Sequence, residues 1–202
     1  MNAVFSSCYA GNIDYYSCLY KTKELLIDIH ENYIKQSFRN RCEIYGANGK
    51  LPLVIPIVRR NGKTPLKDVK IEYCQGWQKI HWKSLESSYR SSPFFEYYED
   101  KFIGLYEQKN ITFLIDFNIE LQNIFIQLLG LEIEIKHTDS YKKEHKDMID
   151  VRGQFHPKKM LSDYYTEIKY NQVFEEKFGF ISNLSIYDLI FNEGPAAVHV
   201  LS

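Results

Sequence analysis

The sequence predicts a single α/β domain over residues 1–202, in which a mixed central sheet is flanked by helices and followed by a helical C-terminal part. Short apolar or alternating runs typical of strands are interspersed with segments in which apolar residues recur every three or four positions. The 202 residues are 45% hydrophobic and 25% charged, which suits one globular domain with a sizeable core. No internal repeat or low-complexity segment is present.

Six segments of the chain have the pattern of strands. They are residues 2–9, 24–30, 42–45, 51–58, 66–73 and 131–137. Asn48 and Gly49 separate the third segment from the fourth, and an Asn-Gly pair between two such runs indicates a hairpin. Because proline has no N–H, Pro52 and Pro56 predict that the fourth strand lies at an edge or carries a bulge. The strand order cannot be read from these patterns.

Apolar residues at helical spacing predict helices in six further segments. They are residues 13–21, 77–91, 94–107, 111–129, 164–179 and 185–191. Ser185 and Asp188 form a capping box at the start of the last one, where Ser185 has a structural role. By contrast, residues 138–163 are polar and charged, and we expect them to form a mobile surface loop or lid able to fold onto a ligand.

Composition excludes several classes of function. The net charge is −1, with 25 basic and 26 acidic residues mixed along the chain, so we expect no nucleic-acid partner. No run of about 18 apolar residues is present, so no membrane span is predicted. The four cysteines are scattered and no export signal is visible, which indicates a reduced cytoplasmic protein. Neither a metal site nor a cofactor is predicted, and the oligomeric state is left open.

Residues 33–49 contain a polar cluster that a folding core does not require. Lys35, Arg39 and Arg41 lie close together in sequence, around Asn40. Cations that share a face repel one another, and the arginine fork suits two oxygens of a phosphate or carboxylate. The cluster therefore predicts a site for an anionic ligand. The alternative is that the arginines pair with carboxylates of neighbouring segments.

The helix predicted at 77–91 places His81 on its inward face, one turn after Trp77. His81 is either a satisfied core histidine or a general acid or base that faces a cavity. Asp68, near the start of the strand 66–73, and Asp28, in the strand 24–30, are the carboxylates that could assist it. Tyr9, Tyr33 and Trp77 supply aromatic rings that would cover a ligand.

Two smaller features lie where predicted strands end. His30, Glu31 and Asn32 lie at the end of the run 24–30, and strand ends in α/β sheets commonly open onto a site. Cys8 lies after the first strand, among small residues. It is either a buried structural thiol or, paired with His81, the nucleophile of a thiol enzyme, in which case the two side chains must lie within hydrogen-bonding reach.

Several segments taken together resemble the WbqC-like protein family of bacteria, and specifically a Bacteroides-type branch. The ordered set that carries the resemblance comprises Tyr9, Tyr15, Tyr16, Asp28, Lys35, Asn40, Arg41, Ile44, Asn48, Gly49, residues 53–57, Asp68, Ile71, Trp77, His81, Tyr89, Pro93, Phe94, Leu184, Ser185, Asp188, Leu189, Asn192 and Gly194. The resemblance spans nearly the whole chain except residues 138–163. The family's N-terminal His-Gln-Pro signature falls on Phe5, Ser6 and Ser7, so this chain lacks that histidine.

The resemblance implies a cytoplasmic role in the biosynthesis of O-antigen-like or other surface polysaccharides, without a defined reaction. Our first hypothesis is a group-transfer enzyme that holds an anionic activated substrate through Lys35, Arg39 and Arg41, with Asn40 orienting it. In this hypothesis His81, assisted by Asp68, is the general acid or base. The second hypothesis is a non-catalytic small-ligand-binding or accessory protein of the same pathway.

Overall fold

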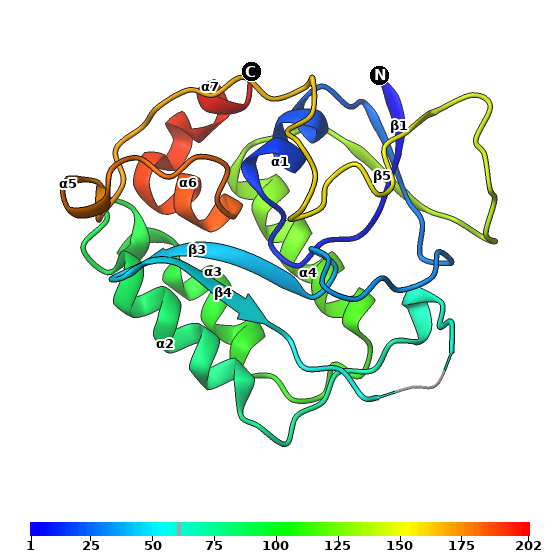
Figure 1. The fold of residues 1–202 in the computed structure, drawn as a ribbon, viewed down its shortest axis with the longest axis horizontal. Coiled ribbons are helices and arrows are strands. Elements are labelled where there is room, and N and C mark those ends of the chain that lie inside the picture. The colour runs from blue at the N-terminus through cyan, green and yellow to red at the C-terminus, as the bar shows by residue number, and fades with distance from the viewer. Residues whose placement is uncertain (60–61) are drawn as a thin grey trace.

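The computed structural model describes residues 1–59 and 62–202, and it confirms the α/β class. Four strands form a parallel sheet in the order β5-β2-β1-β6 (Figure 1). Their bounds are β1 (Asn2–Phe5), β2 (Glu24–Ile27), β5 (Glu134–His137) and β6 (Ile149–Asp150). Phe5 lies opposite Ile27 and Ile27 lies opposite His137, so three strands end at one level. This sheet is parallel rather than mixed.

The predicted hairpin forms, but it makes a sheet of its own. β3 (Arg41–Gly46) pairs antiparallel with β4 (Gly49–Val54), and Gly49 adopts a φ of +98°, which favours glycine. The second strand ends at Val54, before Pro56, and it is an edge strand as the prolines predict. The hairpin packs beside helices instead of extending the central sheet. The backbone N–H of Ser185 donates to the Glu43 carbonyl.

The prediction of a strand at residues 66–73 was wrong. Leu66–Asp68 form a 3-10 helix, and after it only isolated bridges join Lys70 to Phe113 and Ile71 to Ile57. The N–H groups at the start of this helix are bonded to the carbonyls of Glu31 and Ile29. Because the N–H groups of Leu66 and Lys67 are already bonded to residues 29–31, they are not available to pair with a neighbouring strand, and the alternating run does not join a sheet.

The described part of the chain contains seven α-helices. They are α1 (Ile13–Tyr20), α2 (Trp77–Tyr89), α3 (Phe95–Glu107), α4 (Leu114–Leu128), α5 (Glu175–Phe178), α6 (Ile186–Glu193) and α7 (Ala197–Leu201). The predicted helix 164–179 is reduced to α5, because Tyr170 and Gln172 use their side chains to hold a buried carboxylate of α6. Ser185 caps α6 as predicted, with its side chain accepting a bond from the Tyr187 N–H.

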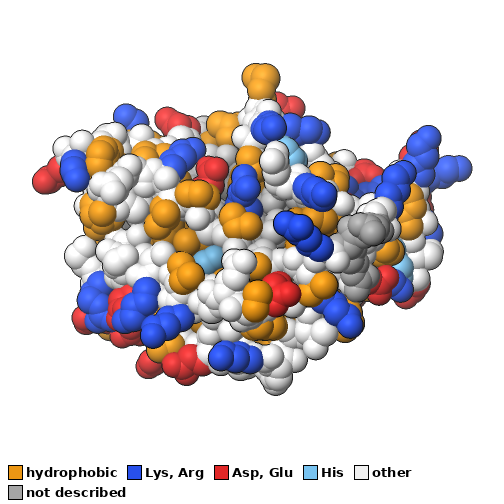
Figure 2. Space-filling view, turned by 60° about the horizontal axis from the view of Figure 1, so that its bottom comes forward, with side chains coloured by type: hydrophobic (Ala, Val, Ile, Leu, Met, Phe, Trp, Pro, Cys, Tyr) orange, Lys and Arg blue, Asp and Glu red, His pale blue; other side chains and the backbone are white. Residues whose placement is uncertain are grey.

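The core lies between α3, α4 and α6, and it is aromatic. Phe102, Phe125, Tyr187 and Phe191 pack with ring centroids 4.9–5.7 Å apart, and all four are fully buried. Each such side chain contributes about 1.5–3 kcal/mol of burial free energy. None of the helices in the described part of the chain is long and apolar enough to cross a bilayer. On the face drawn in Figure 2, basic side chains lie scattered among apolar and acidic ones.

Candidate functional site

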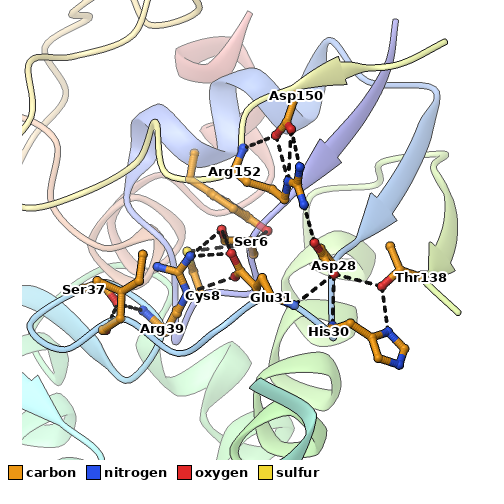
Figure 3. Close-up of polar contacts among 12 residues, drawn as sticks. Ser6, Cys8, Asp28, His30, Glu31, Ser37, Arg39, Thr138, Asp150 and Arg152 are labelled. Carbon is orange, nitrogen blue, oxygen red and sulfur yellow. Dashed lines mark hydrogen bonds and ion pairs between the residues drawn. The ribbon is translucent and has the colours of Figure 1, made fainter. Parts of the chain in front are cut away.

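Polar side chains gather where the parallel strands β1 and β2 end (Figure 3). Ser6 follows β1 directly, and Asp28 and Glu31 follow β2. The carboxyl ends of parallel strands are the usual place for a ligand crevice in α/β sheets. The fold therefore positions these groups at the edge of the sheet where a site is expected.

Arg39 is held at this edge by a buried ion pair with Glu31. Its Nε donates to Glu31 Oε1 at 2.9 Å, and its Nη2 donates to Glu31 Oε2 at 2.6 Å and to Ser6 Oγ at 2.9 Å. Arg39 is 3% exposed and Glu31 is 6% exposed. Burial raises the pKa of the Glu31 carboxyl, and the bonds from Arg39 and Ser6 offset only part of that rise. Arg39 therefore pairs with a carboxylate of a neighbouring segment, which was the alternative to binding an anionic ligand.

A second buried network surrounds Asp28, which is 0% exposed. Its Oδ1 accepts bonds from the backbone N–H groups of His30 and Glu31 and from the Thr138 hydroxyl. Its Oδ2 accepts from Arg152 Nη1 at 2.5 Å. Asp28 therefore fixes the turn that presents Glu31, and it ties that turn to residues from the end of β5 and from the segment after β6.

Arg152 clamps the predicted loop segment 138–163 to the sheet. Besides Asp28, its guanidinium bonds both carboxylate oxygens of Asp150 and the backbone carbonyls of Lys142 and Lys143. Hydrogen bonds to these carboxylates raise the pKa of Arg152 and lower that of Asp150. The segment also supplies strand β6, so part of it is built into the fold.

Two of the predicted substrate-binding residues, Asn40 and Lys35, lie beside Tyr33, while Arg39 and Arg41 act on it through their charge. Tyr33 Oη donates to Asn40 Oδ1 at 2.9 Å, and Asn40 Nδ2 donates to the Ile55 carbonyl at 2.8 Å. Burial raises the pKa of the Tyr33 hydroxyl, while the positive charges of Arg39 and Arg41 act to lower it. Arg41 Nε is buried without a partner among the described residues. Lys35 is exposed and lines the same cavity as Tyr33.

That cavity has a volume of about 590 Å³. Its described lining consists of Tyr33, Lys35, Ile57, Val58, Arg59, Gly62, Thr64 and Val69. Two of these side chains are cations and none is a carboxylate. Lys35 and Arg59 also form no ion pair with another residue of the described ranges.

A smaller cavity of about 320 Å³ lies on the other side of the same stretch of chain. It is lined by Glu31, Asn32, Ile34, Tyr141, Asp150 and Arg152. From Asn32 to Lys35, consecutive side chains alternate between the two cavities. Tyr33 and Lys35 face the larger cavity, and Asn32 and Ile34 face the smaller one.

His81, Tyr9 and Trp77 form a separate aromatic cluster, and His81 is only 3% exposed. The Tyr9 hydroxyl lies 2.8 Å from His81 Nδ1 and 2.6 Å from the Tyr106 hydroxyl. The Tyr9 ring stacks on His81, and Trp77 meets the imidazole edge-on at 5.1 Å. Burial lowers the pKa of His81 to about 4, against a smaller opposing effect from the Val54 backbone. This environment is that of a satisfied core histidine.

We expect the imidazole of His81 to titrate with a midpoint near 4 in a pH series of NMR spectra. A depressed pKa means that the unfolded state binds this proton more readily, so His81 contributes stability above pH 6.5 that is lost as the pH falls toward 4. The resonance is assigned by its absence in His81→Gln. A midpoint at or above 6.5 would show a solvated or functional histidine instead.

The remaining predicted residues are placed as follows. Asp68 is half-buried in the 3-10 helix, one residue before Val69 of the larger cavity. Cys8 does not contact His81 by a hydrogen bond; its thiol points to the Ser6 carbonyl, and burial raises its pKa to about 12. It is therefore a protonated structural thiol at neutral pH.

The sequence reasoning did not single out Arg152 or Asp150 as site residues. Both lie in the polar segment that was interpreted only as a loop. A weak signal was available, because Ile149 and Val151 alternate with these two residues in the manner of a short strand. Two residues of strand are too few for a pattern to be recognised.

The sequence profile of the WbqC-like protein family matches residues 7–164. That match includes the segment 138–163, which the resemblance left out, and it ends before the residues 184–194. An uncharacterized protein of Mycobacterium tuberculosis (strain H37Rv), Rv1507c, is 24% identical over 141 residues.

The alignment with Rv1507c covers 69% of this chain and 61% of the relative, so the chain spans less than two thirds of that protein. No solved structure matches significantly. The Bacteroides-type branch stays a prediction. The family assignment depends on the profile match, which covers well over half of the chain. The chain belongs to the WbqC-like protein family.

Proposed function

We propose that the chain is a group-transfer enzyme of bacterial surface-polysaccharide or related small-molecule biosynthesis. In this proposal an anionic activated substrate binds in the 590 Å³ cavity beside Tyr33. The observation that carries it is the charge of the lining, where Lys35 and Arg59 meet no carboxylate among the described residues. Two unpaired cations that share a hollow repel each other, and an anion relieves that repulsion.

The side chains around the cavity suggest how the ligand is held. Lys35 and Arg59 contact its phosphate or carboxylate, and the fork of Arg59 suits two oxygens at once. Arg41 carries an Nε–H that no described residue accepts, close to Tyr33. Tyr33 is oriented by its bond to Asn40, and Ile57 supports an apolar part of the substrate.

In the transfer step a nucleophilic atom of the acceptor forms a bond to the electrophilic centre, and the anionic group leaves with the electron pair. Lys35 and Arg59 stabilise the negative charge on the leaving group. We assign the acceptor's proton to Asp68, which precedes Val69 in sequence and lies outside the described lining, so that it reaches the acceptor and not the two cations. The acid–base role of His81 stays a prediction, and its burial among Tyr9 and Trp77 favours a structural role.

A second candidate is a non-catalytic binding or accessory protein of the same pathway. Two observations favour it. The Arg39 guanidinium donates its hydrogen bonds to Glu31 and Ser6. The Nδ1 atom of His81 is hydrogen-bonded to the Tyr9 hydroxyl. A site whose titratable groups are internally paired can bind a ligand without turning it over.

The test is a thermal-shift screen with nucleotide sugars, acyl-CoAs and amino acids. A ligand that binds only the folded state raises the melting temperature, and at a hundred times its Kd it stabilises by about 2.7 kcal/mol. We expect one anionic class to do so and Lys35→Ala and Arg59→Ala each to weaken its binding about tenfold. Lys101→Ala, an exposed lysine of α3, is the matched control and should bind normally.

The same samples separate the two candidates. Under the enzyme proposal, mass spectrometry detects conversion of the bound ligand in the presence of an acceptor, and Asp68→Asn abolishes it without changing affinity. Binding without conversion in the wild type supports the accessory role. If every anionic class leaves the melting temperature unchanged, or Lys35→Ala and Arg59→Ala bind as tightly as Lys101→Ala, the cavity is not an anion site.

A further inference from the structure

We infer that the 320 Å³ cavity lined by Glu31, Asn32, Ile34, Tyr141, Asp150 and Arg152 is a second small-molecule site, for a cationic ligand that carries an amine and hydroxyl groups. Residues 32–35 contribute alternately to its lining and to that of the anion cavity. The inference does not depend on that cavity, because it rests on a different lining and a different charge.

Arg152 is the reason that this cavity does not take an anion. An arginine in a cavity wall ordinarily offers its N–H fork to a phosphate or carboxylate. Here Nε and Nη2 are bonded to Asp150, Nη1 is bonded to Asp28 and to the Lys142 carbonyl, and Nη2 reaches the Lys143 carbonyl. An incoming anion would have to break this clamp to reach a donor.

The charged side chains that line the cavity, taken together with their ion-pair partners, sum to a negative charge. Glu31 and Asp150 lie in the wall, and Asp28 lies behind Arg152. These three carboxylates face two guanidinium groups, those of Arg152 and of Arg39, which is behind Glu31. The bonds from Arg152 hold the pKa of Asp150 below its usual range, so this carboxylate is ionised at neutral pH. A partly enclosed space with this balance attracts a cation and repels an anion.

The other lining groups fit a hydroxyl-bearing ligand of about monosaccharide size. Tyr141 is 55% exposed, and its ring is held by the Arg152 guanidinium 5.6 Å from the ring centroid. An aromatic ring fixed in this way offers a flat apolar face to the C–H groups of a sugar. Asn32 is exposed, and its side chain makes no hydrogen bond within the described ranges, so its amide can both donate to and accept from a hydroxyl.

The position of the cavity supports the same conclusion. Its lining includes residues that follow the carboxyl ends of β2 and β6, and this is the edge at which ligands of parallel sheets bind. Glu31, Asn32 and Ile34 of the lining come from the turn after β2, and Tyr141, Asp150 and Arg152 come from the clamped segment. Figure 3 shows Glu31, Asp150 and Arg152 at this edge of the sheet. A pocket between a sheet edge and a segment fixed by a buried ion pair is preformed, which lowers the entropic cost of binding.

The experiment measures the binding of D-glucosamine, D-glucose and D-glucuronate to the whole chain at pH 7, by calorimetry or by chemical-shift changes. We expect affinity to follow the order glucosamine, glucose, glucuronate. Tyr141→Ala should weaken glucosamine about tenfold, while Tyr97→Ala, a tyrosine of α3 that is 76% exposed, should have no effect. Asp150→Asn should weaken glucosamine more than glucose, because it removes charge and keeps shape.

Clear results would overturn the inference. Glucuronate binding as tightly as glucosamine would show that the wall does not select for positive charge. Absence of binding by all three probes at millimolar concentration, or equal affinities in Tyr141→Ala and Tyr97→Ala, would show that this cavity is not a site for such ligands. The Lys35→Ala and Arg59→Ala variants should bind glucosamine like the wild type, which separates this result from the anion site. A thermal melt of each variant checks that it is folded.

Discussion

Replacing Arg39 with alanine is expected to lower the free energy of unfolding by about 3–5 kcal/mol, the usual cost of removing one partner of a buried ion pair. Arg39 is 3% exposed, and its loss leaves the Glu31 carboxylate buried with only the Ser6 hydroxyl as a side-chain donor. Urea denaturation of the wild type and the variant measures the change.

Two further variants test the cause of that loss. Arg90→Ala removes an arginine whose side chain is 52% exposed and which pairs with Glu86 on α2, so it should cost less than about 1 kcal/mol. Glu31→Gln in the Arg39→Ala background should restore part of the stability, since it removes the uncompensated charge. If the double variant is no more stable than Arg39→Ala, the penalty comes from lost packing and not from the orphaned carboxylate.

Asp188 is expected to make the stability of the protein depend on pH in the direction opposite to that of His81. Its carboxyl is fully buried on α6 and accepts bonds from the hydroxyls of Tyr89 and Tyr170 and from Gln172 Nε2, with no cation among these partners. Burial raises its pKa to about 6, and the three hydrogen bonds only partly oppose this.

A raised pKa means that the folded state holds the proton more tightly than the unfolded state. The stabilisation by Asp188 is therefore complete below 3.8, the ordinary pKa of an aspartate, and it is lost as the pH rises through about 6. With one pKa unit worth about 1.4 kcal/mol, the change amounts to at most about 3 kcal/mol.

The measurement compares Asp188→Asn with the wild type by urea denaturation at several pH values. The penalty of the substitution should be largest near pH 4 and shrink toward pH 7, because the amide does not titrate. Taking the difference cancels the contributions of His81 and the other titrating groups. A penalty that stays constant or grows with pH would mean that Asp188 is ionised throughout and is stabilised by the Tyr89 and Tyr170 hydroxyls.

Local sequence patterns predicted the elements whose signals are contained in a few neighbouring residues. The Asn48-Gly49 turn gave the hairpin, Ser185 gave the start of α6, and the apolar spacing gave α2 with His81 on its inward face. The run 66–73 shows the limit of this approach. Its alternation matches a strand, but the first two N–H groups of the run donate to the carbonyls of Glu31 and Ile29. No local pattern can reveal these bonds, because their acceptors lie in another segment.

The candidate site divides in the same way. The stretch 33–49 was predicted to hold a ligand-binding cluster, and in the structure Asn40 bonds the Tyr33 hydroxyl while Lys35 lines the same cavity as Tyr33. What each cation does there was not predictable, because Arg39 is sealed by Glu31 while Lys35 faces an open cavity. Burial decided this difference, and burial depends on which distant segment covers each side chain.

The sequence by itself determined the α/β class, the hairpin, the principal helices, the family resemblance and the location of the cationic stretch. The tertiary structure alone decided which charges are free. Arg152 reaches Asp28 across 124 residues of sequence, and Tyr9 reaches His81 across 72. The physical reason is that periodicity and turn chemistry act between near neighbours, whereas the desolvation and pairing of a charge depend on every segment that packs around it.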